Sequence, residues 1–264
     1  ARVSAKIAAG LRLDEIMLAN TPASFEPTLD YVVTKMPRFA FDKFAGASNK
    51  LGTQMKATGE VMAVGRTIEE SLLKAVRSLE IGAYHLYLPK FHHMPIDELL
   101  DYIKDGTDDR IFALAQLMWL GVDYNRLCNI TGIDMLFLDK IHNIVELERE
   151  IKDAPITREN LLRAKRMGFS DRHLAHLWKC SEQDVYGKRR EFGVFPVYKM
   201  IDTCASEFES YVPYFYSTYE EENESVVSDR PKVIVLGAGP IRIGQGVEFD
   251  YSTVHAVKTI RAHG

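Results

Sequence analysis

Apolar residues recur every three or four positions through most of residues 96–194, with polar residues between them. This spacing places the apolar side chains on one face of an α-helix, so the region is predicted to be helical. The helices that the pattern predicts cover residues 97–103, 109–120, 134–151, 157–166, 171–178 and 182–192. Because the connections between them are short and none has a strand pattern, they predict a compact all-helical bundle of about a hundred residues.

Residues at the ends of the predicted helices agree with the periodicity. Thr157 begins one helix, and Lys165 and Arg166 occupy its last turn before Gly168. Basic charge is favourable at the carboxyl end of a helix, and glycine readily adopts the left-handed backbone that often follows it. Ser170 can then cap the next helix through its hydroxyl.

The first eighty or so residues have a mixed pattern. The predicted elements are a helix over 1–19 whose first segment ends at Gly10, strands over 29–36 and 60–65, and a helix after Thr67 that reaches residue 79. Pro37 is expected to close the first strand, because proline cannot donate to a sheet ladder. Thr67 and Glu70 have the spacing of a capping box, in which each side chain accepts a hydrogen bond from the other residue's amide. This region is predicted to be α+β and to be part of a larger domain.

The pattern changes again after Gly193. Two extended aromatic segments are followed by an acidic run, 220–225, that has the composition of a solvated linker. Residues 232–251 then combine an aliphatic run, a glycine-rich loop and a helical pattern. A continuous aliphatic run is typical of a strand buried on both faces of a parallel sheet. The stretch therefore predicts the first βα unit of an α/β domain.

The glycine-rich loop resembles a dinucleotide-binding motif only in part. The G-x-G-x-x-G pattern requires a glycine where this chain has Arg242. It also requires a second strand that ends in an acidic residue about 20 positions later, and the sequence stops at Gly264. A dinucleotide-dependent oxidoreductase is therefore kept as the weakest alternative.

The composition is that of a globular protein with one large or two ordinary domains. The 264 residues are 46% hydrophobic and carry a net charge of −4, which gives no electrostatic reason to expect nucleic acid or an anionic membrane as a partner. No apolar run approaches the length of a membrane span, and the start at Ala1 is expected to be an internal cut. Cys128, Cys180 and Cys204 are isolated, so no disulfide framework is expected and a reducing cytoplasm is the predicted compartment.

Two candidate motifs are more simply explained by structure than by function. His92 and His93 are adjacent and point in different directions, so we expect surface histidines and no metal site. Residues 173–190 have the helix, tight turn and basic second helix of a DNA-reading helix-turn-helix. The basic cluster at 188–190 is offset by neighbouring acidic residues, which favours an ordinary helix pair. A nucleic-acid-binding protein remains the stronger of the two alternatives.

Five longer runs carry a resemblance to a known family. They are residues 23–39, 55–71, 197–208, 216–219 and 239–251. Each closely resembles the large subunit of bacterial carbamoyl phosphate synthetase, and their order along the chain is the same. The resemblance implies three parts: the C-terminal part of the carboxyphosphate-forming ATP-grasp domain (1–78), a helical oligomerisation domain with a linker (79–228), and the start of the carbamoyl-phosphate-forming half, a Rossmann-like pre-ATP-grasp domain (229–264).

The resemblance also implies an activity for the whole subunit. The family makes carbamoyl phosphate from bicarbonate, ammonia and two ATP, for pyrimidine or arginine biosynthesis, and uses magnesium or manganese and potassium. Its partner is a glutamine amidotransferase small subunit, and it self-associates through the helical domain. No complete active site, bound cofactor or metal is expected within this chain, which would supply scaffold, oligomer contacts and tunnel wall.

Four residues match positions along the family's carbamate tunnel. Glu60 and Glu248 match tunnel carboxylates, and Met55 and Arg242 match lining neighbours. Carbamate is lost quickly in bulk water, so a passage that excludes solvent protects it. By their sequence alone, Glu60 is an ordinary residue at a strand edge and Glu248 a favourable partner of a helix dipole. The chain is several residues shorter than the family between Met17 and the following proline, so contacts made through that loop are not carried over.

Overall fold

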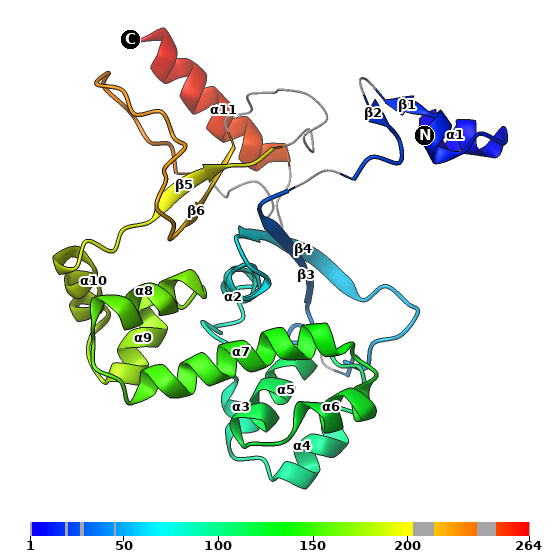
Figure 1. The fold of residues 1–264 in the computed structure, drawn as a ribbon, viewed down its shortest axis with the longest axis vertical. Coiled ribbons are helices and arrows are strands. Elements are labelled where there is room, and N and C mark those ends of the chain that lie inside the picture. The colour runs from blue at the N-terminus through cyan, green and yellow to red at the C-terminus, as the bar shows by residue number, and fades with distance from the viewer. Residues whose placement is uncertain are drawn as a thin grey trace.

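The computed structural model describes residues 2–18, 21–26, 29–44, 46–202, 214–236 and 247–263. A cluster of helices from the middle of the chain, here called the central cluster, fills the lower half of Figure 1. The β3–β4 and β5–β6 strand pairs lie above it, and α11 and α1 with β1–β2 lie towards the top of the view. The described strands form three two-stranded sheets, β1–β2, β3–β4 and β5–β6, each antiparallel. The fold is therefore mixed helix and sheet, as predicted.

The helices of the central cluster are α2 (Ile68–Ser78), α3 (Pro89–His92), α4 (Ile96–Tyr102), α5 (Arg110–Trp119), α6 (Tyr124–Thr131), α7 (Met135–Lys152), α8 (Arg158–Arg166), α9 (Asp171–Trp178) and α10 (Glu182–Glu191). The peripheral helices are α1 (Arg2–Ala8) and α11 (Val247–Ala262), with a short 3-10 turn at Leu13–Glu15. The strands are β1 (Met17–Leu18), β2 (Thr21–Pro22), β3 (Val32–Phe39), β4 (Ala57–Gly65), β5 (Val197–Met200) and β6 (Phe215–Thr218).

One hydrophobic core joins the central helices. The longest helix of the described residues, α7, buries Leu138, Ile144 and Ile151 completely. Leu73 of α2 belongs to the same core, so α2 is packed into the helical cluster although it directly follows β4. Fully burying a leucine or isoleucine contributes about 1.5–3 kcal/mol, which makes this shared core the main stabilising feature of the cluster. The predicted all-helical bundle is confirmed over 96–194, where no strand is present.

The predicted helix caps are mostly confirmed. The hydroxyls of Thr157, Ser170 and Ser181 each accept a hydrogen bond from the amide three residues later, at 3.1–3.2 Å. Thr67 likewise accepts from the amide of Glu70 at 3.1 Å. The reciprocal bond is different from the prediction, because the Glu70 carboxylate accepts from the amide of Arg66, one residue before the cap.

Several predicted boundaries are wrong. Strand β3 continues through Pro37, which pairs with Glu60 of β4. Among the described residues β4 is the only partner of β3, so the missing amide of Pro37 can face away from the ladder, as is usual on an edge strand. The helix predicted over 1–19 is α-helical only over Arg2–Ala8. Gly10 ends this first segment, as predicted, with a left-handed backbone (φ of 95°), but a 3-10 turn and β1 follow where the helix was expected to continue.

Two helices lie where none was predicted. Residues 82–95, whose aromatic and histidine-rich composition predicts a linker or crossing segment, contain α3, and α6 fills the gap between two predicted helices. Helix α6 has recognisable signals, since Asp123 caps the amide of Asn125 at 3.0 Å and Gly132 ends the helix with φ of 68°. These are the residue types that mark helix ends in a sequence.

The strand predicted after Pro231 is absent. Residues 231–236 have no regular secondary structure, and the side chains of Val233, Ile234 and Leu236 are 66%, 83% and 92% exposed. A parallel strand depends on hydrogen bonds from its neighbours, and no described residue pairs with this segment. The predicted helix that follows is confirmed as α11, while the glycine-rich loop at 237–246 lies outside the described residues.

Candidate functional site

The predicted tunnel residues are only partly described by the structure. Glu60 lies in β4 with its side chain 46% exposed, and its carboxylate pairs with Lys35 of β3 at 2.8 Å. Met55 precedes β4 and is 92% exposed. Arg242 and the side chain of Glu248, which belongs to the first turn of α11, lie outside the described residues. The structure therefore does not test whether the four residues line one passage, and their tunnel role stays a prediction.

A buried carboxylate links α2 to the β5–β6 pair. Glu70 is 1% exposed, and its Oε1 pairs with the Lys74 ammonium at 2.8 Å, while its Oε2 accepts a hydrogen bond from the Thr218 hydroxyl at 3.1 Å. Lys74 also donates to the carbonyl oxygens of Val64 and Ser217, at 2.9 and 2.6 Å. These bonds hold the end of β4, the start of α2 and the end of β6 in one arrangement.

A second group of buried charges continues from α2 to α8, α9 and α10. Arg77 donates to the carbonyl of Gly168 at 2.8 Å. Asp171 accepts from the Lys165 ammonium through Oδ1 and from Arg189 through Oδ2, both at 2.8 Å. We call Glu70, Lys74, Arg77, Lys165, Asp171 and Arg189 the charged joint. Since buried charges are tolerated only when they are paired, the joint explains why so many ionisable groups lie at this junction.

The charged joint also bears on the helix-turn-helix alternative. Arg189 belongs to the basic cluster that suggested a DNA-reading helix, yet its side chain is 12% exposed and bonded to Asp171. Lys188 pairs with Glu191 at 2.8 Å on the same helix. Because two of the three basic residues of this cluster are paired with carboxylates, the helix pair is better explained as part of the helical core.

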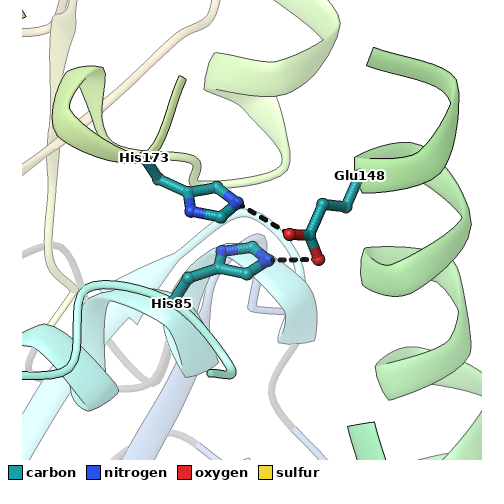
Figure 2. Close-up of side chains that lie close together, drawn as sticks. All are labelled: His85, Glu148 and His173. Atoms are coloured by element: carbon teal, nitrogen blue, oxygen red, sulfur yellow. Dashed lines mark ion pairs between the residues drawn. The ribbon is translucent and has the colours of Figure 1, made fainter. Parts of the chain in front are cut away.

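The most unusual cluster of side chains in the described residues is His85, Glu148 and His173 (Figure 2). Nε2 of His85 lies 3.4 Å from Oε2 of Glu148, and Nε2 of His173 lies 3.3 Å from Oε1 of the same carboxylate. The two imidazole rings stack with their centroids 3.7 Å apart and their planes 9° from parallel. One carboxylate thus faces two stacked imidazoles, as Figure 2 shows.

Three separate elements position this cluster. His85 lies in the irregular segment between α2 and α3, Glu148 projects from α7, and His173 lies in the first turn of α9. The backbone of His173 is fixed by the cap, because its amide donates to Ser170. The ring of Phe169 packs edge-on against both histidine rings, at 4.7 and 5.5 Å between centroids. The apolar contact places the cluster at the margin of the hydrophobic core.

The surroundings shift the pKa values of two members of the cluster. Burial, and next the neighbouring His173, lower the pKa of His85 to about 4, so its ring is neutral at pH 7. Burial would raise the pKa of Glu148, but the contacts with His173 and His85 outweigh it and hold that pKa below its ordinary range. Glu148 is therefore a carboxylate at neutral pH.

This cluster was not predicted from the sequence. His85 lies in the aromatic segment 82–95, His173 in the predicted helix pair, and Glu148 at a position on the apolar stripe of residues 134–151. The position of Glu148 among the core residues of its helix was the one signal of such a cluster in the sequence, because a carboxylate at a core position needs a partner. The partners are 63 residues before it and 25 after it in sequence, so only the fold brings them together. His92 and His93 are exposed, as predicted.

The structure defines a chain built around an all-helical domain, with a two-stranded unit before it and a short strand pair and a helix after it. Residues 60–193, just over half of the chain, match the family model described as carbamoyl-phosphate synthetase large chain, oligomerisation domain. Residues 229–264 match the model described as carbamoyl phosphate synthase preATP-grasp domain. The chain belongs to the carbamoyl-phosphate synthetase large chain family. Within the described residues, no helix is both long enough and apolar enough to cross a bilayer.

Proposed function

We propose that the chain is the central part of the large subunit of a glutamine-dependent carbamoyl phosphate synthetase. Such an enzyme makes carbamoyl phosphate from bicarbonate, ammonia and two ATP, and is a carbon–nitrogen ligase. The observation that carries the proposal is the order of the two matches, with an oligomerisation domain at 60–193 followed by a preATP-grasp domain at 229–264. This order is the one expected where a helical domain separates two ATP-grasp halves.

The chain's own contribution is to hold the parts of the subunit together. The shared core fixes α2 to the helical domain, and the charged joint fixes the β5–β6 pair to α2. A scaffold needs such rigid connections, because small displacements of catalytic elements cost large factors in rate. ATP, its magnesium or manganese ions and potassium would bind to other parts of the subunit, and the isolated chain should not hydrolyse ATP.

The partners follow from the same proposal. The large subunit would receive ammonia from a glutamine amidotransferase small subunit in the cytoplasm, and it would self-associate through its helical domain, consistent with the oligomerisation-domain match. Neither nucleic acid nor a membrane is proposed as a partner.

The tunnel role of Glu60, Met55, Arg242 and Glu248 is part of this proposal. Met55 lies two residues before β4 and Glu60 is the fourth residue of that strand. Both side chains are exposed, so they are free to face another part of the subunit. A wall that excludes water would protect carbamate between the two phosphorylation steps. The Lys35–Glu60 ion pair lies on the surface of β3–β4 and offers a way to separate this role from local stability.

Steady-state kinetics of the complete enzyme test the proposal. Glu60→Trp should obstruct the passage, so carbamoyl phosphate synthesis should fall about tenfold or more, equivalent to about 1.4 kcal/mol, while bicarbonate-dependent ATP hydrolysis is retained. Lys35→Met is the matched control, because it removes the same ion pair without adding bulk at Glu60. Equal loss of both activities in Glu60→Trp, or no loss in either, would contradict a tunnel role.

A further inference from the structure

His85, Glu148 and His173 bring three possible metal-ligand atoms together, which suggests a role in addition to the function proposed above. We propose that these three side chains bind one divalent transition-metal ion such as Zn²⁺, through Nε2 of each histidine and the Glu148 carboxylate. The ion would join the segment between α2 and α3 to α7 and α9. Imidazole and carboxylate are established zinc ligands, and two histidines with one glutamate form a known three-residue zinc set.

The spacing of the donor atoms supports coordination. Tetrahedral zinc has bonds of about 2.0–2.1 Å, so neighbouring ligand atoms lie about 3.4 Å apart. The two nitrogen-to-oxygen distances, 3.4 Å to His85 and 3.3 Å to His173, have this value. All three donors lie within 4.8 Å of one another. A metal ion could therefore be accommodated without movement of the backbone.

The burial of unpartnered nitrogens is an independent observation that indicates a ligand. Nδ1 and Nε2 of His85 and Nε2 of His173 are inaccessible to solvent and have no hydrogen-bond partner. The two side chains are 3% and 8% exposed. A buried polar atom without a partner costs about 1–3 kcal/mol, so native structures seldom keep several together without a use. A metal ion would give both Nε2 atoms a partner.

The ring geometry requires one adjustment. A metal ion lies close to the plane of each imidazole that binds it, and the two rings are stacked 9° from parallel. The rings must therefore open towards Glu148. Rotation about the last side-chain torsion achieves this at low cost, because that torsion is broad in histidine.

The access to the cluster also suits a metal ion. A pocket of about 460 Å³ opens beside the cluster, with Tyr84, Tyr87 and His176 in its wall. It provides a route of entry and space for water as a fourth ligand. The guanidinium of Arg172, also in this wall, lies 3.8 Å from the centre of the Tyr84 ring.

Direct metal-binding measurements on the full chain test the proposal. After treatment with a chelator, the wild-type protein should bind one equivalent of Zn²⁺ in competition with a chromophoric indicator, and Co²⁺ should give the visible absorption of a four-coordinate site. Added Zn²⁺ should raise the thermal unfolding midpoint, since an ion that binds only the folded state stabilises it. His173→Leu and Glu148→Gln should each weaken Zn²⁺ binding by at least about 10–100-fold. Replacing an outer-shell partner already costs this much, and the loss of a direct ligand should cost no less.

Two control variants separate this site from adventitious binding. Glu150→Gln removes a carboxylate from the same helix, where its side chain is 57% exposed, and His93→Asn removes an exposed surface histidine. Both should bind Zn²⁺ as the wild type does. Absence of stoichiometric binding by the wild type, or unchanged affinity in His173→Leu and Glu148→Gln, would overturn the proposal.

X-ray absorption of the zinc-loaded wild type does not depend on how well the variants fold. It should show scattering from two imidazole rings together with oxygen ligands. Scattering from fewer than two imidazoles would exclude this set of ligands, whatever the affinity.

Discussion

Lys165 shows how a single buried charge is accommodated in this chain. Its side chain is 8% exposed, and its ammonium donates to the carbonyl of Phe169 and to the Asp171 carboxylate, both at 2.8 Å. The ring of Tyr219 lies 5.2 Å from the same nitrogen. Burial nevertheless lowers the pKa of Lys165 to about 8, with Asp171 opposing the shift. The charged state of this residue is therefore less favourable in the folded protein than in the unfolded chain.

Stability should depend on pH through Lys165. Between pH 8 and the unfolded-state pKa of 10.5, the unfolded chain keeps a proton that the folded chain has released, so the free energy of unfolding should increase with pH. Below pH 8 the lysine is charged in both states and its contribution no longer changes. Urea denaturation of the wild type and Lys165→Met, at intervals from pH 7 to 9.5, measures this contribution. The free energy of unfolding of the wild type should rise relative to that of Lys165→Met by up to about 1.4 kcal/mol per pH unit above pH 8. Parallel pH profiles would contradict the assignment.

At the scale of secondary structure, the turn between α8 and α9 is fixed by a close contact with α2. Gly168 has a left-handed backbone with φ of 94°, and a Cβ at this position would lie 2.9 Å from the Cα of Glu70. The carbonyl of Gly168 also accepts a hydrogen bond from Arg77 of α2. The glycine is therefore required both by its own backbone conformation and by the approach of the neighbouring helix.

Gly168→Ala should destabilise the fold more than the equivalent change at Gly132. Both glycines have positive φ, but nothing lies within 4 Å of a Cβ built at Gly132. Gly132→Ala should cost only the backbone strain, about 1–2 kcal/mol, whereas Gly168→Ala adds a steric clash of about 1–3 kcal/mol. Thermal or urea denaturation of the two variants measures the difference. Equal losses of stability would show that α2 can move away from the turn.

At the scale of the molecule, the helical domain combines a continuous core with apolar residues on its surface. Leu136 and Phe137, in the first turn of α7, are 53% and 55% exposed, although the residues that follow on α7 contribute to the core. Scattered apolar side chains are normal on protein surfaces, but adjacent ones are suited to association. Because residues 60–193 match an oligomerisation domain, we expect the start of α7 to contact another copy of the chain.

Light scattering can test this contact. The average mass of the wild type should increase with protein concentration, and Leu136→Asp should shift the association to about tenfold higher concentration or more, because burying a leucine contributes about 1.5–3 kcal/mol. Tyr186→Asp is the matched control, since Tyr186 is a 41% exposed aromatic residue on α10. An association that weakens in Tyr186→Asp and not in Leu136→Asp would place the interface elsewhere.

The sequence by itself determined most of the helices of the central cluster and the starts of several of them. Helical periodicity predicted α4, α5, α7, α8, α9 and α10, and the hydroxyls of Thr157 and Ser170 marked two helix starts that the structure confirms. These features depend on contacts within a few residues, so they are present in the local sequence. The runs that resemble carbamoyl phosphate synthetase also indicated the family that the domain matches confirm.

Only the tertiary structure decided which distant residues meet. Glu148 has the position of a core residue in its own helix, and it becomes part of a candidate metal site because the fold places His85 and His173 beside it. Residues 233–236 have the composition of a buried strand and yet are exposed, because no described strand pairs with them. Pairing and burial depend on residues far away in the sequence, so periodicity along one segment cannot specify them.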